Sequence, residues 1–224
     1  MHRADPLPQP TVRLLRWASA VELELDLAGT AALLDAPARD RLDTSSATSA
    51  RRFLFGRALL LRTVAETIGT DSERIEVTAV CPDCGLAHGR PRVRAGGRTV
   101  HVSVSHTADA SAVAVSTEHP VGVDVERIDA ARFAGVEDVA LTPAEREQWQ
   151  RLPDRRRLRA LAERWTAKEA VTKALGTGLT TDPATIDLGP DAGPRVTETA
   201  GHHFFIDHPE RAPGFVVATA LMLP

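Results

Sequence analysis

The sequence predicts an α+β fold in which mainly antiparallel sheets pack on two long helices. Helical periodicity extends over residues 51–68 and 154–175, and short segments of alternating apolar and polar residues flank each helix. The order strands, long helix, strands therefore occurs twice, although no strong internal repeat is visible. With 224 residues, 43% of them apolar and 25% charged, the chain can build one large domain or two small ones with a real core. Antiparallel sheets packed on helices fit this order of elements.

The first fifty residues contain weaker signals. Residues 1–11 hold three prolines, so we expect a loose lead-in. Strands are expected at residues 12–17 and 21–27, and a helix at residues 30–42. Pro37 marks an interruption of that helix or a second start. Residues 43–50 are small and polar, and we expect a loop with several possible helix caps.

The helix expected at residues 51–68 carries an apolar stripe and several arginines. The stripe consists of Phe53, Leu60, Leu61, Val64 and Ile68. Arg51 and Arg52 are expected in its first turn. A guanidinium offers a planar fork of donors to phosphate, although scattered arginines are also common on ordinary surface helices.

A strand expected at residues 75–80 leads into a cysteine-containing segment. Cys81, Cys84 and His88 have the spacing of half a zinc site. Closed zinc sites need four ligands, and the chain offers no convincing second pair, although His101 and His106 remain candidates. A tight turn with reduced thiols is the alternative, and the sequence leaves both open.

The remaining elements follow from alternation, turn residues and caps. A turn is expected at residues 94–98, strands at 100–104, 111–116, 121–126, 185–188, 195–199, 203–207 and 215–223, and an irregular or short-helical segment at 128–141. Thr142 and Glu145 form a capping box with Pro143 at the first helical position. A helix is therefore expected from this box to about Arg151.

Two stretches carry candidate chemistry. In Val121-Gly-Val-Asp-Val-Glu126 the valines alternate with Gly122, Asp124 and Glu126, so both carboxylates share one strand face. Mg²⁺ prefers such oxygen ligands, with water and substrate phosphate completing its shell. The glycine permits close approach. Taken alone, an exposed strand face with two acids explains this stretch equally well.

The second stretch lies on the helix that ends at Gly176. Trp165, Glu169 and Lys173 are four residues apart and share one face, and Lys168 lies on a neighbouring face. A solvated helix with a Glu–Lys pair is the ordinary explanation of this pattern.

Together the two stretches resemble the paired signature of the 4′-phosphopantetheinyl transferases, (I/V)-G-(I/V)-D-x-E followed by W-x-x-K-E-(A/S)-x-x-K. Three shorter motifs agree with it: Arg52-Phe-Leu-Phe-Gly56 matches R-x-x-x-G, Gly89-Arg90-Pro91 matches G-(K/R)-P, and Ser105-His106 matches S-H. The chain is similar to the larger, Sfp-type branch from about residue 12 to the end. It departs from some members in lacking extra basic residues upstream of Arg51.

The resemblance implies a pseudo-twofold monomer of two similar halves with the site between them. It implies a flexible lead-in at residues 1–11, an N-terminal half at 12–117 that binds coenzyme A phosphates, and a C-terminal half at 118–224 that carries the metal site. The implied reaction transfers the 4′-phosphopantetheine arm of coenzyme A to a serine of an apo acyl or peptidyl carrier protein and releases adenosine 3′,5′-bisphosphate. Polyketide and nonribosomal peptide carriers of a bacterium are the expected partners, and a role in fatty-acid synthesis stays open.

The resemblance also implies residue roles. The implied ligands of Mg²⁺, or alternatively Mn²⁺, are Asp124, Glu126 and Glu169. The implied catalytic residues are Glu169 as candidate base, Lys173 and Asp124. The implied coenzyme A-binding residues are Arg51, Arg52, Arg90, Ser105, His106, Lys168 and Lys173. Phe133, Val136 and Val139 are candidate carrier contacts that could equally belong to the core.

Composition narrows the classes of partner. The net charge of −3 argues against a nucleic acid, and no apolar run approaches the length of a membrane span. The N-terminus shows no secretory signal and two cysteines form no disulfide framework, so we expect a cytoplasmic enzyme. Two alternatives remain: another Mg²⁺-dependent transferase of a phosphate group, and a non-catalytic module that binds coenzyme A or carrier proteins.

Overall fold

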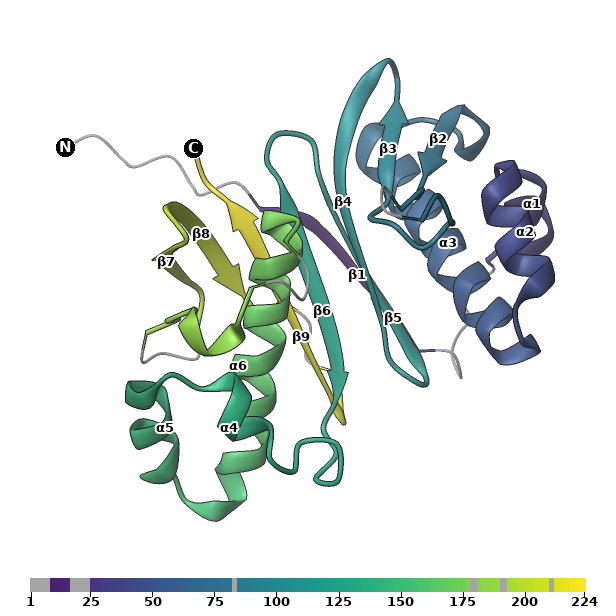
Figure 1. Cartoon of the computed structure of the whole chain (residues 1–224). Helices are drawn as coiled ribbons and strands as arrows, with labels where there is room; N and C mark the ends of the chain where they lie inside the picture. The colour runs from purple at the N-terminus through teal and green to yellow at the C-terminus, as the bar shows by residue number, and fades with distance from the viewer. Residues whose placement is uncertain (1–8, 17–24, 82–83, 178–180, 190–192, 210–211) are drawn as a thin grey trace.

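Two antiparallel sheets, each covered by a long helix, make up the computed structural model of the chain (Figure 1). The structure describes residues 9–16, 25–81, 84–177, 181–189, 193–209 and 212–224. The first sheet has the order β1-β5-β4-β3-β2, with β1 Thr11–Arg16, β2 Ile75–Thr78, β3 Arg92–Ala95, β4 Arg98–His106 and β5 Ala110–Ser116. The second has the order β6-β9-β8-β7, with β6 Val121–Arg127, β7 Arg195–Thr199, β8 His202–Asp207 and β9 Phe215–Met222.

The helices comprise α1 Leu27–Ala32, α2 Ala36–Thr44, α3 Ala47–Ile68, α4 Val136–Ala140, α5 Pro143–Gln150 and α6 Asp154–Leu175, and short 3₁₀ turns lie at η2 Ser72–Arg74 and η4 Pro183–Thr185. The α+β class with two similar halves is thus confirmed. The bounds of α6 and β7 agree with the sequence expectation residue for residue. The capping box at the start of α5 is also present.

Helix α3 covers the first sheet. Leu60 and Val64 of α3 pack with Val102 of β4 and Val113 of β5 in one buried cluster. The helix begins one turn earlier than predicted, because the hydroxyl of Ser46 caps it by accepting the N–H of Ser49 at 3.3 Å. The loop predicted at residues 43–50 is therefore shorter than expected and consists of Ser45 and Ser46, although the helix cap expected in it is confirmed at Ser46. Arg51 and Arg52 lie in the second turn of α3 rather than the first.

Helix α6 covers the second sheet at very short range. A Cβ placed on Gly122 of β6 would lie 1.8 Å from the carbonyl oxygen of Ala170 of α6. Only glycine fits this contact, so the glycine of the strand motif sets the distance between β6 and α6. The helix ends at Gly176, whose φ of 80° lies in the left-handed region.

The two halves meet along β4, β5 and β6. The valines at 121, 123 and 125 of β6 pack against the alanines at 110, 112 and 114 of β5. The hydroxyl of Ser103 in β4 accepts the N–H of Val123 at 3.0 Å. The opposite face of β6, with its two carboxylates, is therefore turned toward α6 and lies beside the end of β4.

Two predicted strands need comment. Most of the strand predicted at residues 21–27 lies outside the described residues, and Leu27 opens α1, which Asp26 caps through the N–H of Gly29 at 2.7 Å. The strand predicted at residues 185–188 is wrong. This segment leaves the 3₁₀ turn η4, and its Leu188 N–H donates to the Glu145 carboxylate at 3.2 Å rather than to a neighbouring strand.

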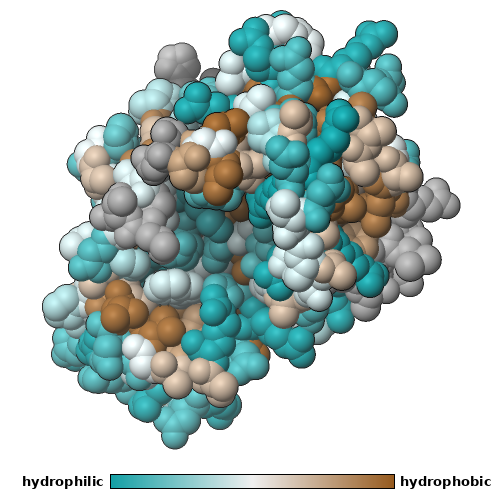
Figure 2. Space-filling view, turned by 45° about the vertical axis from the view of Figure 1, so that its right-hand side comes forward, coloured by the Kyte–Doolittle hydropathy of each residue, from teal (hydrophilic) through white to brown (hydrophobic). Residues whose placement is uncertain are grey.

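The surface is mainly hydrophilic on the face shown in Figure 2, where the hydrophobic residues of the described chain form small separate groups. Among the helices that the structure describes, none has the length and hydropathy needed to cross a bilayer.

Candidate active site

Asp124 lies at the centre of the candidate site. Its carboxylate is buried, and its Oδ1 accepts two hydrogen bonds at 2.6 Å, from the hydroxyl of Ser105 in β4 and from Nζ of Lys173 in α6. Its Oδ2 is buried without a hydrogen-bond partner among the described residues. A buried carboxylate oxygen is costly to leave unpaired. The oxygen is therefore a fitting ligand for a hard cation such as Mg²⁺.

Glu126 lies two residues further along the same face and is also buried. Arg132 forms a forked ion pair with it, with its Nε 2.7 Å from Oε2 and its Nη2 in close contact with Oε1. The indole N–H of Trp165 donates to Oε1 at 3.3 Å. Sequence reasoning missed Arg132, because it lies in an irregular segment and matches no motif.

Glu169 projects from α6 toward the same acids. Burial raises the pKa of its carboxyl, and the negative charges of Asp124 and Glu126 raise it further, against the opposing charge of Lys173. Burial likewise raises the pKa of Asp124, opposed by Lys173. The three acids thus share an excess of negative charge, which a bound cation would relieve.

His106 lies where the first half reaches this site. Its Nδ1 is 2.8 Å from the hydroxyl of Ser111, and its ring fills the space beside Gly56 of α3, where a Cβ would lie 2.2 Å from the ring. Partial burial and then the charges of Lys173 and Arg52 lower the pKa of His106 to about 4. The ring is therefore neutral at pH 7. The glycine of the R-x-x-x-G motif makes room for the histidine of the S-H motif.

The arginines of α3 differ in their surroundings. Arg52 is half-buried, and its charge contributes to the lowered pKa of His106, which places it within electrostatic reach of the site. Arg51 is exposed, with its guanidinium 5.2 Å from the ring centre of Phe55. Arg41 of α2, which sequence reasoning did not single out, also acts on the pKa of His106.

A basic groove lies at the C-terminal end of α6. It begins at Ala174 and Leu175, directly after Lys173, and runs across β2, β3 and β4. Its basic lining consists of Arg90, Arg92, Arg94 and His101, against a single acid, Glu76. Arg90 reaches the C-terminus of α6, since a Cβ on Gly176 would lie 2.7 Å from its Nη1. The groove can accept phosphate groups at its walls.

Lys168 does not face this site, contrary to the sequence expectation. Its side chain is fully buried, and its Nζ lies 2.5 Å from the Glu145 carboxylate, 2.6 Å from the Ala140 carbonyl and 3.0 Å from the Pro183 carbonyl. Arg164 pairs with the same carboxylate at 2.9 Å. Lys168 has no donor left to offer coenzyme A, and it ties α4, α5 and η4 to α6.

The three acids of the site do not form a compact cage. Among the described residues, only Cys81, Cys84 and His88 form a group of three whose potential ligand atoms all lie within 4.8 Å of one another. The three acids of the site are therefore further apart than this. Mg²⁺ keeps several waters and binds through one or two carboxylates together with substrate phosphates, so it needs no such cage. The unpaired Asp124 oxygen and the raised pKa of Glu169 fit this mode of binding.

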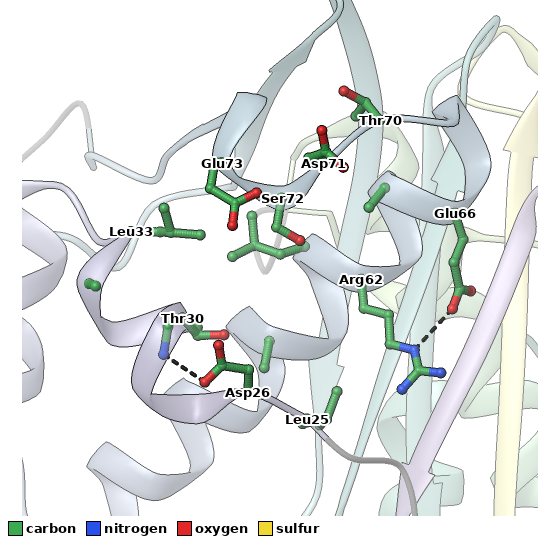
Figure 3. A pocket seen from close by; sticks show the side chains of 15 residues that line it. Leu25, Asp26, Thr30, Leu33, Arg62, Glu66, Thr70, Asp71, Ser72 and Glu73 are labelled. Carbon is green, nitrogen blue, oxygen red and sulfur yellow. Dashed lines mark hydrogen bonds and ion pairs between the residues drawn. The ribbon is translucent and has the colours of Figure 1, made fainter.

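Another pocket lies between α1, α3 and η2, and none of the three acids of the candidate site lines it (Figure 3). Four acids line it, Asp26, Glu66, Asp71 and Glu73, against one arginine, Arg62, which pairs with Glu66 at 2.9 Å. Its negative lining is unsuited to a polyphosphate ligand.

The chain is similar to known proteins in its C-terminal half. Residues 120–220 match the family model of the 4′-phosphopantetheinyl transferase superfamily. A holo-[acyl-carrier-protein] synthase from Streptococcus suis is 46% identical over 63 residues, which cover 26% of this chain and 53% of that protein. A protein of the same name from Levilactobacillus brevis is 51% identical over 39 residues, covering 17% and 32%. The one from Streptococcus sanguinis is 38% identical over 63 residues, covering 26% and 52%. The chain thus spans about half or less of the curated relatives it matches.

Proposed function

We propose that this chain, whose residues 120–220 match the model of the 4′-phosphopantetheinyl transferase superfamily, transfers the 4′-phosphopantetheine arm of coenzyme A to a serine of an apo carrier protein. The observation that carries the proposal is the environment of Asp124. One of its oxygens is held by Ser105 and Lys173, and the other is buried without a hydrogen-bond partner among the residues that the structure describes, beside two further acids. Such a carboxylate serves a metal-assisted reaction at a phosphate group.

Binding of coenzyme A involves both halves in this proposal. Arg52 and His106 would contact the 3′-phosphate, and the neutral ring of His106 would donate a hydrogen bond rather than a charge. Arg90 and the basic groove would hold the pyrophosphate, with Arg51 as an outer contact. The proposal keeps residues 12–117 as the half that binds these phosphates and residues 118–224 as the half with the metal site. Lys168 has no part in it.

The chemical step is a displacement at the phosphorus next to the pantetheine arm. Asp124, Glu126 and Glu169 would hold Mg²⁺, or alternatively Mn²⁺, which when bound neutralises charge on the pyrophosphate oxygens. Glu169, with its raised pKa, would accept the proton of the carrier serine hydroxyl. The serine oxygen forms the new bond to phosphorus, and the bond to the adenosine 3′,5′-bisphosphate oxygen breaks. Lys173 stabilises the negative charge on that leaving group.

The carrier proteins would be acyl or peptidyl carriers of polyketide or nonribosomal peptide synthesis in a bacterial cytoplasm, with the chain acting as an Sfp-type monomer. The curated relatives are named for an acyl carrier protein, which supports the carrier class. Carriers are acidic, and the N-terminal part of α6 carries Arg155, Arg156 and Arg159, which would attract them. Val139, which is 57% exposed, and its neighbour Val136 are the proposed apolar contacts with the carrier. Phe133 is buried and belongs to the core, so it is not available as a contact.

Intact-mass spectrometry tests the reaction. The chain is incubated with several apo carriers, coenzyme A and Mg²⁺, with and without EDTA. We expect a gain of one phosphopantetheine group per carrier that EDTA abolishes. Binding of coenzyme A without any gain would instead favour a non-catalytic module. Transfer of a different phosphate-linked group would favour another Mg²⁺-dependent transferase.

A further inference from the structure

We propose that Cys81, Cys84 and His88 bind a zinc ion that anchors the loop before Arg90. The ligand atoms of these three side chains lie within 4.8 Å of one another, and the described residues contain no second group of three potential metal ligands this close together. The two cysteines are thiols and form no disulfide. Two sulfurs and one imidazole nitrogen are the soft and borderline donors that zinc prefers.

The spacing of the ligand atoms suits a metal of this size. The Sγ of Cys84 lies 2.8 Å from Nε2 of His88. Zinc bonds of about 2.3 Å to sulfur and about 2.0 Å to nitrogen, at a tetrahedral angle, separate two such atoms by about 3.5 Å. The side chains therefore need to open by less than about 1 Å to admit the ion. His88 and Cys84 are both exposed, so their side chains have room to move apart.

Backbone hydrogen bonds fold the loop back on itself and bring its two ends together. The N–H of Gly85 donates to the Cys81 carbonyl at 2.9 Å, and the N–H of Cys81 donates to the Leu86 carbonyl at 2.8 Å. Gly85 has a φ of 74°, which lets the chain turn back toward Cys81. Three protein ligands leave one coordination position, which faces solvent at the exposed Cys84 and His88 and would take a water.

The large apolar side chains of the loop lie outside the core, with Leu86 64% exposed and Val80 48% exposed, whereas the small side chains of Cys81 and Ala87 are buried. Arg41 of α2 donates to the Ala87 carbonyl at 2.7 Å, and Gly89 donates to the Ala79 carbonyl at 2.7 Å. A bound zinc would add a third attachment, two residues before Arg90. The free energy of zinc binding would stabilise the folded conformation of this loop. Zinc would therefore restrict the position of Arg90 beside the basic groove.

Metal analysis of the full-length chain tests this inference independently of transferase activity. The protein is purified under reducing conditions, dialysed against Zn²⁺ and then dialysed against metal-free buffer. Its zinc content is then measured by inductively coupled plasma mass spectrometry. We expect about one zinc per chain for the wild type. Cys84→Ser and His88→Ala should each lower zinc affinity by more than about tenfold, since loss of an outer partner of a metal ligand alone costs about that much. His202→Ala, which removes an exposed histidine of β8, should leave it unchanged.

Cobalt substitution and hydrogen exchange sharpen the result. Co²⁺ should give a thiolate-to-cobalt absorption band that Cys84→Ser weakens and His202→Ala retains. Zinc should slow amide exchange at residues 84–92, and circular dichroism verifies that each variant is folded. A wild type without stoichiometric zinc, or variants that keep zinc in full, would refute the site. Zinc binding without protection of residues 84–92 would refute the anchoring role.

Discussion

Nζ of Lys173 lies 2.6 Å from Oδ1 of Asp124, joining α6 to β6 across the centre of the candidate site. The two residues are 49 positions apart in the chain, and the same carboxylate oxygen is also held by Ser105 of the N-terminal half. One carboxylate therefore connects both halves. Its second oxygen has no hydrogen-bond partner in the described part of the chain.

Lys168 and Lys173 have separable roles, although both belong to one motif. Lys168→Ala should lower the free energy of unfolding by about 3 kcal/mol, because it leaves the buried Glu145 carboxylate with one fewer charged partner. The KM for coenzyme A should stay near that of the wild type in the folded fraction. Lys173→Ala should instead lower the transfer rate of the folded protein by about a hundredfold, and it should also lower the free energy of unfolding, because the buried Asp124 carboxylate loses the ion pair with Lys173. Denaturant unfolding and transfer kinetics check both variants, and a raised KM in Lys168→Ala would restore it as a coenzyme contact.

The contact between Gly122 and α6 predicts a severe effect of one methyl group. Gly122→Ala should destabilise the chain by about 3 kcal/mol or more, since the new Cβ meets the Ala170 backbone, which cannot move without shifting the helix. Gly193→Ala is the matched control, because a Cβ there meets nothing within 4 Å. Thermal unfolding of both variants tests this prediction. Equal melting temperatures would show that β6 and α6 are less closely packed.

Arg132 forms an ion pair with the Glu126 carboxylate, so its guanidinium would compete with a metal cation for that carboxylate. Arg132→Ala should therefore lower the Mg²⁺ concentration for half-maximal transfer by a few-fold, about the effect of 1 kcal/mol of lost competition. Arg127→Ala, which removes a nearby arginine paired with Asp109 instead, should leave it unchanged. The measurement is a Mg²⁺ titration of the transfer rate. A higher Mg²⁺ requirement in Arg132→Ala would mean that the arginine positions Glu126 for the metal.

The lowered pKa of His106 predicts a pH dependence of stability. The unfolded chain, with a histidine pKa of about 6.5, binds a proton in the range where the folded ring, with a pKa of about 4, does not. His106 therefore favours the folded state fully above pH 6.5, and this contribution is lost as the pH falls toward 4. Because the ring is partly open to solvent, we expect a contribution of about 1 kcal/mol rather than the full linkage value.

His106→Gln should remove this contribution, so its free energy of unfolding should vary less than that of the wild type between pH 6.5 and 4. His202→Gln serves as the control on an exposed strand position. Urea unfolding at several pH values provides the measurement. A wild type and His106→Gln variant with parallel pH profiles would show that the ring titrates normally.

The sequence predicts most of the fold because local signals agree with tertiary packing. Periodicity and the glycine at its end define α6, and alternation defines β6. The start of α3 was misjudged because small polar residues favour both loops and helix caps, and Ser46 acts as a cap. The strand β3 was missed because three of its residues, Arg92, Val93 and Arg94, lie too close to a glycine turn to show a pattern.

The site was predictable only in part. The acids of β6 and α6 follow from strand and helix faces, and the structure turns them toward one another. Which way Lys168 points was not predictable, because its neighbouring helix face is covered by α4, α5 and η4, whose placement depends on the whole fold. Arg132 and Arg41 were missed for the same reason. Their positions near the site depend on tertiary contacts between distant segments.

The most direct test of the account is the transfer rate of Asp124→Asn, measured on an apo carrier at saturating coenzyme A and Mg²⁺. The asparagine keeps the size of the side chain and removes the charge that a cation needs. We predict a fall of at least about a hundredfold with an unchanged circular dichroism spectrum, and a similar fall for Glu169→Gln. A folded Asp124→Asn variant within about threefold of the wild-type rate would contradict the account, because the central carboxylate would then have no part in the reaction.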